Sequence, residues 1–357
     1  MFLTDCWYAA GFLDEFGREL RGRTFLGEPV VLFRTEAGEL VALEDRCAHR
    51  RLPLSVGRLK GDTIECSYHG LVYNRSGACI KVPGQNDVPR SAQLRRYPVA
   101  DMYGYSWIWM GDPTRADTRT IPDYSRLSLP GLGRHRIALH VEGNYQLIVD
   151  NLLDLSHLPY VHGTTTGNPP VSESASVKTE RHGDTVQVKR WAENVEPAAT
   201  FVQFGGYCGK VDIWQISQFQ PPCYVRVSYG SGPAGSGIPQ GDAIWEPGHW
   251  GFQVFHGITP ESETTTHQFR YILHEKGNAD AATIAEFYRQ NDQIINEDRI
   301  IFAIQQKALY TTGDGASAAD LKTSAIIRAD GGLIQARSII SGMLQGDRAA
   351  AATKLRA

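Results

Sequence analysis

Two short segments near the start of the sequence each combine a cysteine with a histidine. The first is Cys47-Ala48-His49, and the second is Cys66-Ser67-Tyr68-His69. Thiolates and imidazoles are the ligands that soft and borderline metal ions prefer. Turn-forming residues follow each pair, with Pro53 and Gly57 after the first and Gly70 after the second. We therefore expect two short turns that bring two sulfur and two nitrogen ligands to one metal centre.

Two kinds of metal centre fit this ligand set. A tetrahedral zinc ion would take all four side chains. A Rieske-type [2Fe–2S] cluster would take both thiolates on one iron and both imidazoles on the other. Zinc sites more often draw a pair of like ligands from one segment, whereas each segment here supplies one cysteine and one histidine. This division favours the Rieske cluster over zinc, and over a chance pairing of core cysteines with surface histidines.

A second set of possible ligands lies within residues 150–162. Asp154 and His157 are three residues apart and would share one face of a helix, whereas His162 would be rotated off that face. Pro159 disfavours regular helix between the two histidines, so the chain can bend and bring His162 back. Two histidines and one carboxylate form the facial triad of non-haem Fe(II) oxygenases, which leaves positions open for dioxygen and substrate. The alternative is an amphipathic helix whose polar side chains face solvent.

The elements expected around the first ligand set are short β-strands. A glycine-containing turn at residues 36–39 separates two apolar runs and predicts a hairpin. Residues 111–117 are polar, contain Pro113 and indicate a domain boundary. The strand-like runs cover residues 30–33, 40–43, 63–65, 71–73, 79–82 and 105–110.

The rest of the sequence mixes helical and strand patterns. Helical spacing covers residues 149–158 and 281–307, and alternating aromatic strands occur within 200–275, for example at 211–216. We predict a loop over residues 230–241. The apolar stripe of the long helix would comprise Ile284, Phe287, Tyr288, Ile294, Ile295, Ile301 and Ile304. The pattern predicts an α+β fold with an all-β domain over 1–115, a catalytic domain with an antiparallel sheet and helices over 116–345, and a disordered tail over 346–357.

The composition is that of a globular protein. The 357 residues are 42% hydrophobic and 21% charged, and 36 basic residues against 39 acidic ones give no reason to expect nucleic acid as a partner. No apolar run approaches the ~20 residues that a membrane span requires. Asp5, Asp14 and Glu15 stand where a signal peptide would carry a basic and an apolar segment, which predicts a cytoplasmic protein. In such a reducing compartment, the six cysteines suggest metal binding more than disulfides.

The sequence resembles the Rieske non-haem iron oxygenases, and in particular the vanillate O-demethylase oxygenase subunits and the toluenesulfonate methyl-monooxygenases. The resemblance covers nearly the whole chain, and it implies a helix-grip type of catalytic domain. The motifs that carry it are Cys47-Ala48-His49-Arg50, Cys66-Ser67-Tyr68-His69-Gly70-Leu71, Cys6-Trp7-Tyr8-Ala9-Ala10, Pro83-Gly84-Gln85, Trp107-Ile108-Trp109-Met110-Gly111-Asp112 and residues 150–162.

The resemblance also implies a role for each candidate residue. Cys47, His49, Cys66 and His69 would bind the [2Fe–2S] cluster. His157, His162 and Asp298 would bind a mononuclear Fe(II), with Asp298 matched to the family's carboxylate ligand on a late helix. Glu297 is adjacent but points about 100° away on a helix, and Asp292 is a weaker competitor. The structural alternative for Asp298 is a solvated helix charge.

Asp154 resembles the family's bridging aspartate. Such a residue links a cluster histidine of one subunit to an iron histidine of the next in a homotrimer, and we expect His69 rather than His49 at the cluster end. A carboxylate that binds a ligand histidine fixes the tautomer and the orientation of its ring.

The implied activity is that of the terminal oxygenase component of a monooxygenase system. Electrons from a separate NAD(P)H reductase with flavin and ferredoxin-type centres would pass through the cluster to the iron, where dioxygen is activated. We expect O-demethylation of an aryl methyl ether with release of formaldehyde. The alternatives are methyl hydroxylation of a methylarene carboxylate or sulfonate, cis-dihydroxylation of an aromatic ring, a Rieske electron carrier and a zinc-binding interaction protein.

The sequence does not assign the substrate-binding residues. The catalytic domain is rich in aromatic residues, most of which we expect in the core. His249, His256 and His267 could hydrogen-bond an anionic substrate or lie at the surface.

Overall fold

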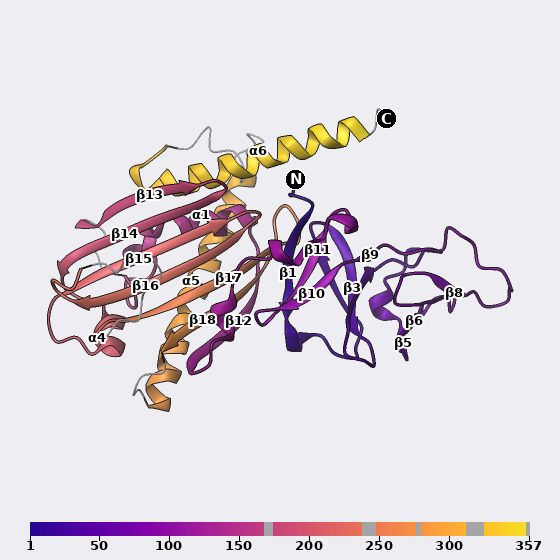
Figure 1. Cartoon of the computed structure of the whole chain (residues 1–357), viewed down its shortest axis with the longest axis horizontal. Helices are drawn as coiled ribbons and strands as arrows, with labels where there is room; N and C mark the ends of the chain where they lie inside the picture. Colours follow the sequence, from indigo (N-terminus) through magenta and orange to yellow (C-terminus); the bar gives the residue numbers. More distant parts are fainter. Residues whose placement is uncertain (168–173, 238–247, 276–279, 312–324, 355–357) are drawn as a thin grey trace. The chain divides into compact units, whose positions relative to one another are not determined.

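The computed structural model describes residues 1–167, 174–237, 248–275, 280–311 and 325–354 (Figure 1). The chain divides into two compact units. One comprises Phe2–Ser128 with Thr259–Glu263, and the other comprises Met1, Leu129–Ile258 and Thr264–Ala357. The break after Ser128 lies beyond the boundary predicted at residue 115.

The first unit consists of three small antiparallel sheets joined by loops and short 3₁₀ turns. Their strand orders are β1-β11-β10, β2-β3-β4-β9 and β5-β6-β7-β8. The strands are β1 (Cys6–Phe12), β2 (Arg21–Phe25), β3 (Glu28–Arg34), β4 (Leu40–Glu44), β5 (Arg58–Lys60), β6 (Thr63–Glu65), β7 (Val72–Tyr73), β8 (Cys79–Lys81), β9 (Arg96–Tyr97), β10 (Val99–Met102) and β11 (Tyr105–Met110). The predicted all-β architecture is confirmed.

The predicted hairpin is formed by β3 and β4, which pair from Val30↔Glu44 to Arg34↔Leu40. Gly38 in its turn has φ +84°, a left-handed conformation that glycine adopts without steric cost. Apolar side chains of this hairpin share one buried cluster with Cys47, Cys66 and Tyr73. Each large apolar side chain buried there contributes about 1.5–3 kcal/mol. The core of this unit therefore holds both thiols in place.

The second unit contains a seven-stranded sheet of order β12-β18-β17-β16-β15-β14-β13. Each neighbouring pair for which a register is defined is antiparallel. The strands are β12 (Leu132–Val141), β13 (Ser176–His182), β14 (Thr185–Val195), β15 (Val211–Gln220), β16 (Tyr224–Pro233), β17 (Trp250–Pro260) and β18 (Thr266–Glu275). The helices are α1 (Tyr145–Leu153), α2 (Leu158–Val161), α4 (Ala199–Gly205), α5 (Ala281–Thr311) and α6 (Gly331–Lys354).

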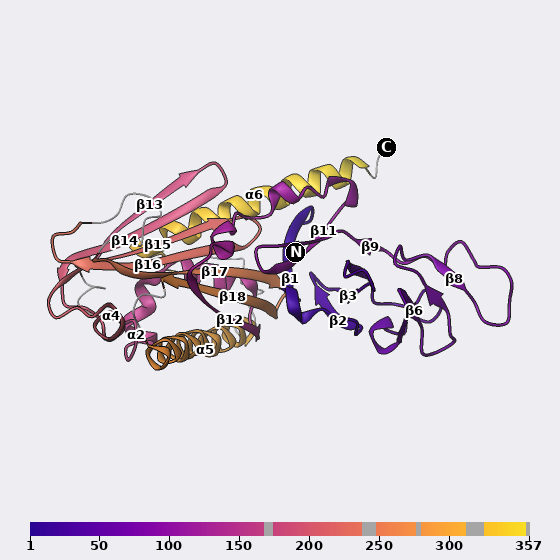
Figure 2. The same cartoon turned by 60° about the horizontal axis from the view of Figure 1, so that its bottom comes forward.

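Three helices cover one face of this sheet (Figure 2). The helix α1 packs on β15 and β16, α5 packs on β12, and α6 packs on β13 and β14. On α5, Phe287 enters a buried cluster with Phe252, Val254 and Ile272 of the sheet. A sheet that wraps around helices on one face is the predicted arrangement, so the expected fold class is confirmed.

Several predicted boundaries are wrong in ways that have local causes. The helix predicted over 149–158 begins at Tyr145, where the Asn144 side chain accepts the Gln146 N–H, and ends at Leu153. The predicted loop at 230–241 begins later, because residues 230–233 continue β16; residues 238–241 lie outside the described residues. The predicted disordered tail begins inside α6, which continues to Lys354.

The apolar stripe predicted for α5 is also partly wrong. Ile301 and Ile304 are 42% and 61% exposed, whereas Phe287, Ile295 and Phe302 are buried. The buried face of α5 also includes polar residues, among them Asn291 and Asp298. Packing against the sheet therefore follows a face that mixes apolar and polar side chains.

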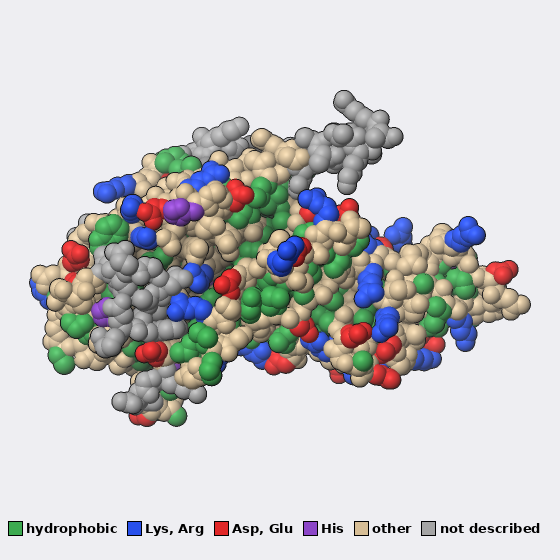
Figure 3. Space-filling view, in the orientation of Figure 1, with side chains coloured by type: hydrophobic (Ala, Val, Ile, Leu, Met, Phe, Trp, Pro, Cys, Tyr) green, Lys and Arg blue, Asp and Glu red, His purple; other side chains and the backbone are tan. Residues whose placement is uncertain are grey.

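Charged side chains of both signs are interspersed among the described residues on the face shown in Figure 3. In the described part of the chain, every helix is too short or too polar to cross a bilayer.

Candidate metal centres

The two Cys-His segments form turns with the same hydrogen-bond pattern. The Cys47 N–H donates to Leu52 O, and Cys47 O accepts the Arg51 N–H; Cys66 makes the same two bonds with Leu71 and Gly70. The residue four positions after each cysteine is left-handed, with φ +62° at Arg51 and +73° at Gly70. The sequence therefore folds locally into two matching loops.

The four side chains of these loops converge in two pairs. The thiols of Cys47 and Cys66 are buried at 2% exposure, and burial raises the pKa of Cys66, with its neighbour Cys47 adding to the shift. The His49 and His69 rings are exposed, and their Nδ1 atoms lie 3.1 Å apart. Two inner sulfurs and two outer imidazoles match the unlike ligand pairs of a Rieske cluster.

Tyr73 contacts this centre and was missed in the sequence. Its hydroxyl lies 3.3 Å from Cys47 Sγ and accepts the Ala48 N–H at 3.1 Å. Because that oxygen already accepts a hydrogen bond, its own proton can be donated to the sulfur. Burial, followed by the neighbouring Cys47, raises the pKa of Tyr73, which keeps the hydroxyl protonated. The only signal in the sequence was a tyrosine on a strand-like run close to Cys66.

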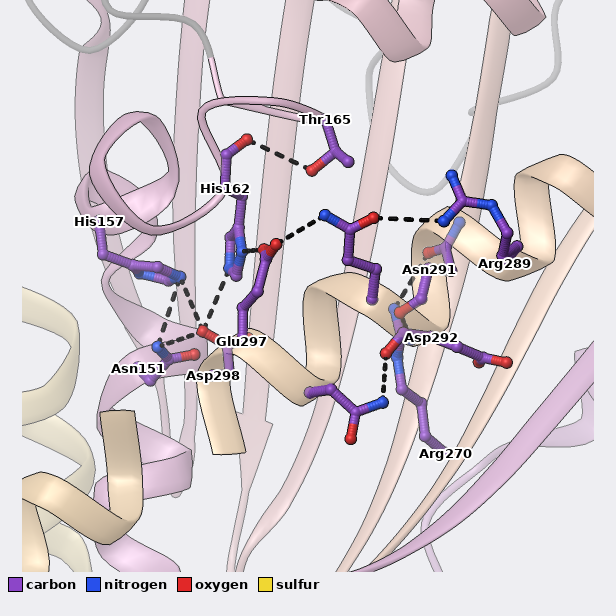
Figure 4. A network of polar contacts seen from close by, with 12 residues as sticks. Asn151, His157, His162, Thr165, Arg270, Arg289, Asn291, Asp292, Glu297 and Asp298 are labelled. Atoms are coloured by element: carbon purple, nitrogen blue, oxygen red, sulfur yellow. Dashed lines mark hydrogen bonds and ion pairs between the residues drawn. The ribbon is translucent and has the colours of Figure 1, made fainter. Parts of the chain in front are cut away.

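His157, His162 and Asp298 come together in the second unit. One ligand atom from each lies within 4.8 Å of the others. Asp298 Oδ1 is 3.1 Å from His162 Nε2 and 3.6 Å from His157 Nε2 (Figure 4). His162 and Asp298 are buried, and His157 is partly buried. Two nitrogens and one carboxylate around a shared space match the donor set of a non-haem iron site.

Hydrogen bonds fix which nitrogen of each imidazole faces that space. His157 Nδ1 donates to Asp154 O at 2.7 Å, and His162 Nδ1 donates to Glu297 Oε2 at 2.7 Å. Both Nε2 atoms are then available as ligands. Among the described residues, the buried His162 Nε2 receives no hydrogen bond. A metal ion that accepts this lone pair would satisfy it, so the residues fit an iron site.

The surrounding charges act differently on the two imidazoles. Burial lowers the pKa of His157, which favours the neutral form that can bind a metal. Burial also lowers the pKa of His162, but Asp298 and Glu297 outweigh it and raise the net value. A divalent cation bound by His162 Nε2 and the Asp298 carboxylate would take the place of a proton on the imidazole.

The turn that carries the histidines differs from the prediction. Asp154 is extended and ends α1, and its carboxylate accepts the Ser156 N–H at 2.9 Å to start the 3₁₀ turn Leu155–His157. Asp154 and His157 therefore do not share the face of one helix, and His157 bonds to the main chain of Asp154 rather than to its carboxylate. Pro159 lies in the first turn of α2, where proline is tolerated, so the bend predicted at Pro159 is wrong; the chain bends at Asp154 and leaves the helix at His162.

Two further polar residues complete this site. Asn151 on α1 donates to Asp298 Oδ1 at 3.2 Å and lies 3.3 Å from His157 Nε2. Glu297, which helical geometry sets about 100° from Asp298, reaches His162 instead. Asp292, the competing carboxylate, is hydrogen-bonded to His135 at 2.8 Å and is not part of the group.

The candidate substrate histidines are spread over the second unit. His256 is buried and lies 3.1 Å from Gln268 Nε2, His249 packs edge-on against Trp214, and His267 packs near His140. The buried aromatic residues of this unit are Tyr145, Phe201, Trp214, Phe219, Tyr224, Phe252, Phe255, Phe269, Phe287 and Phe302. These positions confirm the expectation that most of the aromatic residues are in the core.

Two protein families match the chain in succession. Residues 6–98 match the Rieske [2Fe-2S] domain, and residues 141–346 match the vanillate O-demethylase oxygenase C-terminal domain. The chain is 37% identical to the toluene-4-sulfonate monooxygenase system iron-sulfur subunit of Comamonas testosteroni, over 97% of this chain and 98% of that protein. It is 31% identical to the vanillate O-demethylase oxygenase subunit of Pseudomonas sp. (strain HR199 / DSM 7063), over 98% and 97%.

Among solved structures, dicamba monooxygenase bound to 3,6-dichlorosalicylic acid is similar with a TM-score of 0.87. The sequences are 27% identical, and the match covers 98% of this chain and 99% of that one.

Proposed function

The chain belongs to the Rieske oxygenases with a vanillate O-demethylase type of C-terminal domain, and we propose that it hydroxylates a methyl carbon of an anionic aromatic compound. It is the terminal oxygenase component of a monooxygenase system, with a [2Fe–2S] cluster and a mononuclear non-haem iron. The observation that carries the proposal is the group of His157, His162 and Asp298, with the free Nε2 of His162 inside it.

Each residue of the two centres has a proposed task. Cys47, His49, Cys66 and His69 bind the cluster, and His157, His162 and Asp298 bind the iron. When bound, the cluster supplies single electrons and the iron supplies the site at which dioxygen is reduced. The hydrogen bonds at both Nδ1 atoms hold the imidazoles in the tautomer that binds metal. Asn151 holds the Asp298 carboxylate by donating to Oδ1.

Asp154 is proposed as the bridge between the two kinds of centre in a homotrimer. Its main-chain oxygen accepts from His157, and one carboxylate oxygen accepts from Ser156. The other carboxylate oxygen has no hydrogen bond to the described residues of its own chain, so it can accept one from a cluster histidine of a neighbouring subunit. His69 is the proposed donor.

Electrons must come from another protein. The letters Gly230-x-Gly232-x-x-Gly235 match a dinucleotide-binding pattern, but that pattern works as a turn between a strand and a helix. Here Gly230 and Gly232 lie inside β16, and a Cβ at Gly230 would lie 2.3 Å from Trp214. We therefore propose a separate NAD(P)H reductase with flavin and ferredoxin-type centres as the partner.

Two types of methyl group are candidate targets. A methyl group on the ring would give a benzylic alcohol, and identities of 38% and 37% to two subunits named for toluene-4-sulfonate favour this reaction. A methyl ether would give a hemiacetal that collapses to a phenol and formaldehyde, which is the outcome expected from the sequence. The match to the vanillate O-demethylase domain supports that second candidate.

The test is turnover of the purified protein with a reductase and NADH. Methylarene sulfonates and carboxylates and the matching methyl ethers are supplied, and alcohol, formaldehyde and oxygen uptake are measured. Alanine variants of His157, His162 and Asp298 should lose mononuclear iron and product while the visible spectrum of the cluster persists, because the centres lie in separate units. A protein that holds one zinc and no sulfide, or a diol as product, would contradict the proposal.

A further inference from the structure

Arg270 on β18 is a buried arginine without a carboxylate partner. Arg270 is only 5% exposed. Among the described residues, no acidic side chain lies within ion-pair distance of its guanidinium. Nη1 donates to Asn291 O at 2.9 Å, and Nη2 donates to Asn291 Oδ1 at 3.1 Å. The buried Nε of Arg270 makes no hydrogen bond to any residue that the structure describes. Burial lowers the pKa of Arg270, and Asp292 and Asp298 oppose this only from beyond ion-pair distance. A buried charge without a direct partner is costly, so the position calls for an anion.

Asn291 fixes where the guanidinium lies relative to the iron site. Asn291 and Asp298 are both buried on α5, at 1% and 5% exposure. Seven residues are two helical turns, or about 10 Å along the axis. Figure 4 shows Arg270 at this helix, in the same view as His157, His162 and Asp298. The residue that holds the guanidinium thus lies two turns from an iron ligand, on the same buried side of α5.

Tyr229 connects these two ends of the site. It lies on β16, the middle strand of the sheet, and its ring stacks on Phe252 at 4.9 Å on the face that contacts Phe287 of α5. In spite of that central position its side chain stays partly accessible. Burial raises the pKa of Tyr229, Arg270 and Arg190 oppose the shift, and Asp298 adds to it. Tyr229 therefore carries a polar group on the face of the sheet that α5 covers, where the charges of Arg270 and Asp298 both act on it.

We propose that Arg270 binds the carboxylate or sulfonate group of the aromatic substrate, with Tyr229 lining the same subsite. This inference rests on the proposed function and assigns its anion-binding residue. Asn291 uses two of the five guanidinium N–H groups, so Nε–H and one Nη2–H remain as a fork for two oxygens of the anion. Asn291 acts as a positioning residue that keeps this fork directed away from α5.

The test compares anions with neutral molecules of the same shape. Binding of toluene-4-sulfonate and 4-methylbenzoate, and of the neutral toluene-4-sulfonamide and 4-methylbenzamide, is measured by calorimetry on the holoenzyme without oxygen. We expect Arg270→Gln to weaken binding of both anions by about 30-fold or more and binding of the amides by less than about threefold. Arg270→Lys should restore part of the anion affinity. A difference between sulfonate and carboxylate identifies the preferred anion.

The matched control is Arg226→Gln. Arg226 lies on β16 three residues before Tyr229, where side chains point to the opposite face, and it bonds to Gln218. Arg226→Gln should leave the affinities for both anions and both amides unchanged. If Arg270→Gln and the wild type bind the anions equally, the role of Arg270 is overturned, but the proposed substrate class is not. An equal loss of affinity for the anions and the amides would show that Arg270 serves only in packing. A wild type that binds neither anion would overturn the proposed substrate class as well.

Discussion

Glu297 Oε2 and His162 Nδ1 are joined by a hydrogen bond of 2.7 Å, and the imidazole is fully buried. The other oxygen of Glu297 accepts from Gln293 Nε2 at 2.8 Å, one turn earlier on α5. The carboxylate is thus held on both sides and directs His162 Nε2 toward Asp298. A carboxylate that supports a metal-binding histidine raises the basicity of the ring and fixes its tautomer.

Loss of this carboxylate should weaken iron binding. In Glu297→Gln the amide keeps the size of the side chain but lacks the charge that favours the Nδ1–H tautomer. We expect the affinity for the mononuclear iron to fall by about 10–100-fold. The measurement is an iron titration of protein whose mononuclear iron has been removed with a chelator. Glu286→Gln, which removes a half-buried carboxylate that pairs with Arg289 on the same helix, is the control. Unchanged iron affinity in Glu297→Gln would rule out the role of this hydrogen bond.

Replacing Asp154, the proposed bridge, should stop the reaction after the cluster. Asp154→Asn retains a side-chain oxygen for the Ser156 N–H, so the 3₁₀ turn and both metals should persist. The cluster should still be reduced by the partner, whereas product formation should fall by several orders of magnitude. Rapid-mixing absorbance of the cluster separates the two steps. A variant that turns over like wild type would exclude the bridge.

The subunit arrangement can be tested with the same variant. Chains with Asp154→Asn and chains with His69→Ala are each expected to be inactive alone. In the proposed homotrimer, mixed chains form some interfaces that pair an intact aspartate with an intact histidine, so part of the activity should return. Full activity in a monomer, measured by sedimentation and turnover together, would contradict the inter-subunit path.

The Tyr73 hydroxyl should raise the reduction potential of the cluster. A hydrogen bond to Cys47 Sγ stabilises the more negative reduced state. Tyr73→Phe removes about 1 kcal/mol of this stabilisation, so the potential should fall by roughly 40 mV for a one-electron couple. Redox titration monitored by electron paramagnetic resonance gives the value. Tyr68→Phe is the control, because Tyr68 lies within the second segment and is exposed, and phenylalanine keeps the ring that packs on His69. An unchanged potential in Tyr73→Phe would show that the hydroxyl does not donate to the sulfur.

His256 should make the protein less stable in mild acid. Burial, with Arg270 adding to the effect, lowers its pKa well below the ordinary value of about 6.5. Between these two pKa values the unfolded chain binds a proton that the folded chain excludes. Stability is therefore retained above pH 6.5 and is lost as the pH falls below it, by up to about 1.4 kcal/mol per pH unit. Urea unfolding of His256→Gln should show a weaker pH dependence there, whereas exposed His182→Gln should match wild type.

The cluster segments could be predicted from the sequence because their geometry is local. Cysteine and histidine are two or three residues apart in each segment, and one tight turn with a left-handed residue, Arg51 or Gly70, sets the side-chain directions. The strands around them follow from short alternating runs between turn residues. Tyr73 was not foreseen, because its contact with Cys47 depends on how β7 packs on the other segment.

The iron site needed the tertiary structure at two points. His157 and His162 are near in sequence, but the chain bends before them, at the Asp154 cap, and Pro159 is accommodated in the first turn of α2, which ends just before His162. The choice among Asp292, Glu297 and Asp298 depends on how α5 is rotated against the sheet. That rotation buries Asn291, Ile295 and Asp298 and exposes Ile301 and Ile304, so apolar periodicity alone predicted the last part of the buried face wrongly.

The sequence by itself determined the chemistry of this protein, because metal ligands are specified by residue type and by short spacings that one turn can satisfy. The tertiary structure decided which distant groups act on those ligands. Glu297 meets His162, and Asn291 holds Arg270, only because α5 packs across the seven-stranded sheet. Contacts between segments far apart in the chain depend on the summed packing of many side chains, which no local pattern encodes.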